Sequence, residues 1–122
     1  APATPQIMID VPAPDVMIGK EGPDLDACVT HGVIIGSAAS SQTADVFNST
    51  QGWRNRLDRL PVGARVWICD TKENWVGVVY RGDGPSAPED CRVSEPVAAP
   101  QVYRGPCRSG WVSATSLEIV AG

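Results

Sequence analysis

The sequence lacks the features that mark a membrane protein, a helical protein or a nucleic-acid binder. No apolar run approaches the roughly 20 residues that cross a bilayer as a helix, and no segment repeats apolar residues at helical spacing. The net charge is −4, and the excess of acids lies within residues 1–27, so residues 28–122 are neutral. A neutral body has no basic face to bind phosphates. We therefore expect no nucleic-acid partner, no membrane insertion and almost no helix.

Catalytic and metal-binding motifs are missing as well. The sequence contains neither a Gly-rich phosphate loop nor an H-E-x-x-H motif, and no two cysteines have the close spacing of zinc sites. His31 is the only histidine and follows Cys28 by three residues, which suggests a Cys–His nucleophile. However, positions three apart on a strand face opposite sides of the sheet. We expect no enzyme activity, no cofactor and no metal.

Four cysteines stand out against these absences: Cys28, Cys69, Cys91 and Cys107. An even number of cysteines in a small domain indicates a disulfide framework, and therefore an oxidising compartment. Four cysteines allow three connectivities. The count alone predicts a periplasmic or secreted protein.

The prolines divide the chain. Ten of the eleven fall within residues 1–26 and 82–109, and proline removes a backbone donor from a sheet. We interpret residues 1–26 as an extended leader and residues 82–109 as a long loop. Alternating Ile7, Ile9 and Val11 predict a short strand in the leader that could add to a sheet edge, in its own molecule or a neighbour. The alternative is a mobile tail.

The remaining pattern predicts an all-β domain. Ala64–Cys69 and Trp75–Tyr80 are apolar runs joined by a polar turn at residues 70–74, which is typical of a β-hairpin. Residues 36–52 are interpreted as a turn-rich connection with a short apolar island. Further strands are expected at residues 28–35, 110–112 and 117–120.

Three segments, taken in order, resemble motifs of bacterial SH3 domains. They are Arg59–Ile68, Asn74–Val78 and Ser109–Leu117, and together they span about half the chain. The resemblance implies a small SH3-like barrel over residues 27–122, with residues 82–109 as an insertion. It also implies how the cysteines pair: Cys91 with Cys107 across the insertion, and Cys28 with Cys69.

The same resemblance places candidate ligand-binding residues around a shallow groove. Trp75 holds the position of a tryptophan that often lines this groove, and Trp53 and Tyr80 are further aromatic candidates. Arg54, Arg56 and Arg59 cluster just before the strand pair and could pair with carboxylates of a ligand, because a guanidinium binds a carboxylate through two hydrogen bonds.

Each candidate has a structural alternative. Trp67, Trp75 and Trp111 could simply close a small barrel. The arginines could form a solvated face paired with acids such as Asp58.

We interpret the domain as a non-catalytic binding module, and the resemblance implies peptidoglycan peptides or an exported protein as its ligand. One alternative is an assembly protein that forms homo-oligomers by exchanging its N-terminal segment. Another is a secreted hydrolase inhibitor that presents the loop from Cys91 to Cys107, since a preorganised loop loses little entropy on binding.

Overall fold

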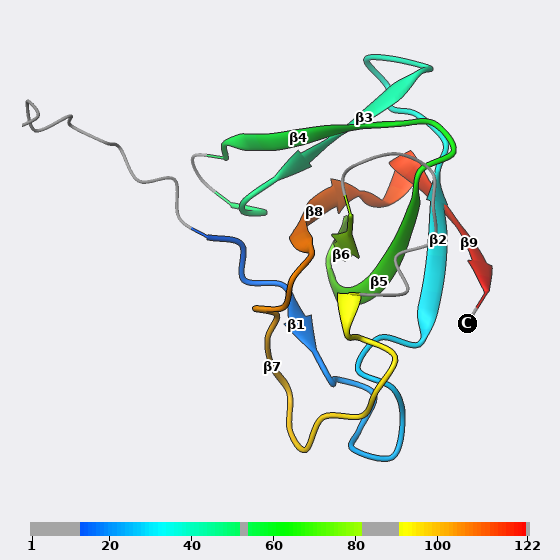
Figure 1. The fold of residues 1–122 in the computed structure, drawn as a ribbon. Helices are drawn as coiled ribbons and strands as arrows, with labels where there is room; N and C mark the ends of the chain where they lie inside the picture. Colours follow the sequence, from blue (N-terminus) through cyan, green and yellow to red (C-terminus); the bar gives the residue numbers. More distant parts are fainter. Residues whose placement is uncertain (1–12, 52–53, 82–90, 122) are drawn as a thin grey trace, which may run out of the picture.

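The computed structural model describes residues 13–51, 54–81 and 91–121, and this part of the chain is all-β (Figure 1). Its strands are β1 (Met17–Ile18), β2 (Thr30–Ile34), β3 (Thr43–Phe47), β4 (Arg56–Pro61), β5 (Arg65–Lys72), β6 (Trp75–Tyr80), β7 (Gln101–Val102), β8 (Arg108–Ser113) and β9 (Leu117–Ala121). A 3-10 turn, η2 (Ala114–Ser116), links β8 to β9. Within the described ranges no helix is long and apolar enough to cross a membrane. The predicted all-β class is confirmed.

Seven of the strands form one antiparallel sheet, in the order β4-β3-β8-β6-β5-β2-β9. The sheet is strongly bent, as Figure 1 shows, and one of its faces forms an apolar core. The core side chains come from all seven strands and one junction: Ile34, Ala44, Val46, Leu60, Ala64, Val66, Val76, Val78, Tyr80, Val112 and Leu117. This alternation of buried side chains is what the sequence predicted for Ala64, Val66 and, at the margin of the core, Ile68.

The predicted hairpin of β5 and β6 is present, with a tighter turn than expected. Antiparallel pairing runs from Trp67 opposite Val79 to Lys72 opposite Trp75. The polar residues Asp70, Thr71 and Lys72 therefore belong to β5, and only residues 73 and 74 make the turn. The polar residues 70–74 predicted a turn, but the strand pairing between β5 and β6 continues as far as Lys72.

A second hairpin, β3–β4, lies where the sequence analysis expected part of a long connection. That expectation is wrong for Thr43–Phe47, which pairs with β4 on one side and meets β8 at Phe47 on the other. Ala44 and Val46 alternate with partly exposed neighbours and point into the core. β3 has five residues, and one of its two buried side chains is the small Ala44. Its alternation is therefore a weak signal for a strand in the sequence.

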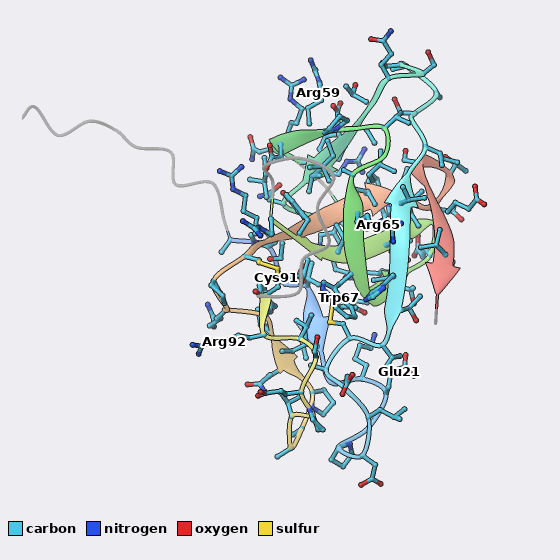
Figure 2. All side chains as sticks on the ribbon, turned by 45° about the vertical axis from the view of Figure 1, so that its right-hand side comes forward. Glu21, Arg59, Arg65, Trp67, Cys91 and Arg92 are labelled. Atoms are coloured by element: carbon cyan, nitrogen blue, oxygen red, sulfur yellow. A yellow bond between two sulfur atoms is a disulfide. The ribbon has the colours of Figure 1, made fainter. Side chains whose placement is uncertain are left out.

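The outer face of β5 and β6 is buried by two covering segments, the described N-terminal residues 13–28 and the loop of residues 91–107. A second apolar cluster there combines Ile18, Ala27, Cys28, Trp67, Val79, Cys91, Val93 and Tyr103. Backbone hydrogen bonds join the two covering segments, from Ala27 N to Glu95 O and from Tyr103 N to Val16 O. Figure 2 shows Trp67 and Cys91 near one another on this side of the sheet. The described parts of residues 1–26 and 82–109 are therefore packed onto the domain.

Two disulfides fasten these covering segments. Cys28 is bonded to Cys69 of β5, and Cys91 is bonded to Cys107 across the insertion. These are the pairs that the resemblance implied. The first ties the N-terminal segment to the sheet, and the second closes the insertion on itself.

A buried carboxylate at the end of β5 makes the same connection through hydrogen bonds. A bulge between Ile68 and Asp70 turns Asp70 toward the covering segment. Its side chain is 6% exposed and forms an ion pair with Lys20. It also accepts hydrogen bonds from the backbone N–H groups of Met17 at 3.1 Å and Thr71 at 2.8 Å.

Gly77 makes room for this contact. A Cβ at Gly77 would lie 2.9 Å from the Asp70 Cβ and 3.0 Å from Val16 Cγ1, closer than side chains pack. Glycine is therefore required by a close approach in the middle of a strand.

Replacement of Asp70 by Ala should lower the free energy of unfolding by about 2 kcal/mol, because it leaves the partly buried Met17 N–H without its acceptor. Urea denaturation monitored by tryptophan fluorescence measures the change. Asp24→Asn, at an exposed position, is the control. Equal stabilities of Asp70→Ala and the control would show that the carboxylate does not hold the segment.

Removal of the Cys91–Cys107 disulfide by a double Ser substitution should cost on the order of 3 kcal/mol, since the bond closes a loop with a sequence separation of 16. Removal of Cys28–Cys69 should cost about 4 kcal/mol, because its sequence separation is 41. Urea denaturation of each double variant gives the comparison. A larger loss for the shorter loop would contradict the chain-entropy account.

Candidate functional site

Two aromatic rings and one guanidinium meet beside β8. Phe47 ends β3 and Trp75 begins β6, and the intervening strand β8 places them together. Their ring centroids are 5.8 Å apart and the rings are nearly perpendicular, at 86°. The Arg54 guanidinium carbon lies 4.9 Å from the centroid of Trp75 and 5.9 Å from that of Phe47. We call Phe47, Arg54 and Trp75 the aromatic–arginine site.

The rings hold the guanidinium by its attraction to their electron-rich faces. Arg54 Nη1 also donates a hydrogen bond to the carbonyl oxygen of Thr50 at 3.3 Å. A guanidinium carries five N–H donors, and contact with a ring face uses none of them. The site can therefore present a fixed positive charge with donors left for an anionic ligand.

The structure brings together only part of the predicted set of binding residues. Trp75 and Arg54 are in contact, and exposed Arg56 is paired in register with Phe47 on the neighbouring strand. Trp53 lies outside the described residues, as does the predicted Ile7–Val11 strand. Phe47 was not among the binding residues predicted from the sequence. The alternating pattern of Thr43–Phe47 could have indicated the strand that carries it.

Tyr80 lies away from Trp75, at the opposite end of β6. Only 2% of its surface is exposed, and its ring belongs to the core. Its hydroxyl donates a hydrogen bond to Asp58, whose Oδ2 accepts a second bond from Arg108 Nη1 at 2.8 Å. Burial, together with the neighbouring Asp58 carboxylate, raises the pKa of Tyr80 above its ordinary value of 10.

The other two described tryptophans are packing residues, in agreement with the structural alternative. Trp111 is 2% exposed and donates its Nε1 hydrogen to Asp15 Oδ1 at 2.9 Å. Trp67 is 7% exposed and makes an edge contact with His31, with ring centroids 3.7 Å apart. Both tryptophans help to seal the covering segments onto the sheet.

The remaining candidates from the sequence have structural partners. Arg59 pairs with Asp45 at 3.2 Å, so it fits the solvated face that was considered as an alternative. Figure 2 shows Arg59 far from Trp67 and Cys91, over the β3–β4 hairpin. Cys28 is held in a disulfide, which removes the thiol that a Cys–His nucleophile would need. Over the described ranges, no group of three or more His, Cys, Asp or Glu side chains is placed to hold a metal ion.

Comparison of the chain with protein-family models, with curated proteins and with solved structures finds no match. The function is therefore inferred from the geometry of this molecule.

The buried Tyr80 hydroxyl predicts a loss of stability in alkali. Because the pKa of Tyr80 is higher in the folded state than in the unfolded state, its contribution is complete below pH 10 and falls as the pH rises further. Tyr80→Phe cannot ionise, so its free energy of unfolding should decline less between pH 9 and 11. Urea denaturation across this range measures both slopes, and equal slopes would contradict the assignment.

Proposed function

We propose that this protein is a non-catalytic binding module of an oxidising compartment, periplasmic or secreted, and that its aromatic–arginine site binds peptides bearing carboxylates. The observation that supports this most is the placement of Arg54 over both Trp75 and Phe47. The two disulfides support the compartment.

The site favours a carboxylate for two reasons. A guanidinium is always charged and its N–H fork matches the two oxygens of a carboxylate. Holding it against two rings removes part of the side-chain entropy that an exposed arginine would otherwise lose on binding. Exposed Arg56 on the adjacent strand adds positive charge, whereas the nearby Asp45 is already paired with Arg59.

Peptidoglycan stem peptides and acidic segments of exported proteins both present such carboxylates. The resemblance of three ordered segments to bacterial SH3 domains favours the first class. A seven-stranded sheet with an apolar core on one face, and with the β5–β6 hairpin in the expected place, is consistent with an SH3-like domain. We propose cell-wall peptide as the ligand.

Titration of the oxidised protein with soluble peptidoglycan stem peptides should quench tryptophan fluorescence in a saturable way. Arg54→Gln should weaken binding about tenfold, the loss expected for a charge-assisted hydrogen bond. Trp75→Phe should weaken it two- to fivefold, about the value of an exposed cation–π contact, and should remove most of the quenching.

Arg59→Gln is the matched control, because this exposed arginine lies on β4, only five residues after Arg54, but is paired with Asp45. Isothermal titration calorimetry of all variants supplies affinities that do not depend on the tryptophan signal. The proposal fails if Arg54→Gln and Arg59→Gln bind equally well, or if the unaltered protein binds none of the peptides.

A further inference from the structure

A separate pocket lies at the other end of β6, about 17 Å along the strand from Trp75. It is open to solvent and has a volume of about 570 Å³, within the range of ligand sites. Four segments of the chain form its walls: Ala13 and Pro14, Leu57 and Asp58, Tyr80, and the loop from Tyr103 to Ser109. We call it the Arg104 pocket, after the arginine on its rim.

The loop that carries Arg104 is fixed from inside. The Tyr103 hydroxyl donates a hydrogen bond to the Cys91 carbonyl oxygen at 2.7 Å and accepts one from the Cys107 N–H at 3.0 Å. A Cβ at Gly105 would lie 2.6 Å from that hydroxyl, so the ring packs directly on the glycine. The Cys91–Cys107 disulfide closes the same loop. A ligand therefore meets a loop that is already ordered, which lowers the entropic cost of binding.

Among the described residues, the charges of the pocket leave one arginine without a partner. Asp58 is occupied on both sides, by the Tyr80 hydroxyl and by Arg108. Arg104 is exposed, and its side chain makes no hydrogen bond or ion pair with any residue of the described ranges. The lining formed by the described residues thus carries one uncompensated positive charge. Leu57, which is 39% exposed, supplies an apolar surface in the same pocket.

We propose that the Arg104 pocket is a second binding site, which takes an extended peptide carrying an apolar side chain followed closely by a carboxylate. Arg104 pairs with the carboxylate, and Leu57 with Pro14 contacts the apolar side chain. This inference does not rest on the aromatic–arginine site, because the two sites share no residue. The occupant is a separate peptide, because the charge and the apolar surface both face open solvent.

The test is a titration of the oxidised, 15N-labelled full chain with the peptide acetyl-Ala-Leu-Ala-Glu-amide, followed by NMR. We expect saturable shifts of the Arg104 and Gly105 amides. The matching peptide with Gln in place of Glu should bind about tenfold more weakly, as expected for loss of one charge-assisted pair.

Arg104→Gln should weaken binding of the Glu peptide by the same factor. The variant should therefore bind the Glu and Gln peptides with equal affinity. Arg65→Gln is the control, since Arg65 is exposed on β5, where Figure 2 shows it, and does not line the pocket. Arg54→Gln should leave the shifts at Arg104 and Gly105 unchanged, so failure of one proposed site is distinguishable from failure of the other.

Three outcomes would overturn the proposal. The first is the absence of saturable shifts at Arg104 and Gly105. The second is equal binding of the Glu and Gln peptides to the unaltered protein. The third is a shift of the same two amides when Asp10→Asn is introduced without any peptide, because the acidic N-terminal segment would then be the occupant of the pocket.

Discussion

The buried carboxylate of Asp70 joins the two layers of this protein. It lies at a bulge in β5, so it belongs to the sheet, yet it accepts the Met17 N–H and pairs with Lys20 of the covering segment. A charged group with so little exposure is stable only when its hydrogen bonds are made. The covering segment is therefore placed by polar contacts as well as by apolar burial, and Gly77 supplies the space that this contact needs.

Both candidate sites depend on that two-layer frame. β6 has one face in the core and the other under the cover, and one candidate site lies at each of its two ends. Trp75 opens one end beside Phe47 and Arg54. Tyr80 closes the other end, beneath the loop braced by Tyr103 and the Cys91–Cys107 disulfide. The cover and the second disulfide thus hold the loop of residues 91–107 as a fixed wall of the Arg104 pocket.

Sequence patterns predicted the elements whose residues repeat regularly and missed those that depend on distant partners. The β5–β6 hairpin was foreseen because long runs of β-branched and aromatic residues alternate there. β3 was missed because Ala44 and Val46 give only two buried positions. Tyr80 was grouped with Trp75 since both belong to one strand, although a six-residue strand separates its ends by more than the width of a site.

By itself, the sequence determined the all-β class and the placement of the hairpin, because alternating apolar residues have only one efficient way to bury one face. The two disulfide pairs agree with the pairing that the resemblance to SH3 domains implied, whereas the cysteine count alone left three connectivities open. Only the tertiary structure decided which side chains share a site. Phe47, Arg54 and Trp75 come together beside β8, and Arg104 and Leu57 line one pocket. Both groupings arise from sheet order and loop packing. Sheet order and loop packing depend on residues far apart in the chain, so these sites cannot be predicted from the spacing of residues in the sequence.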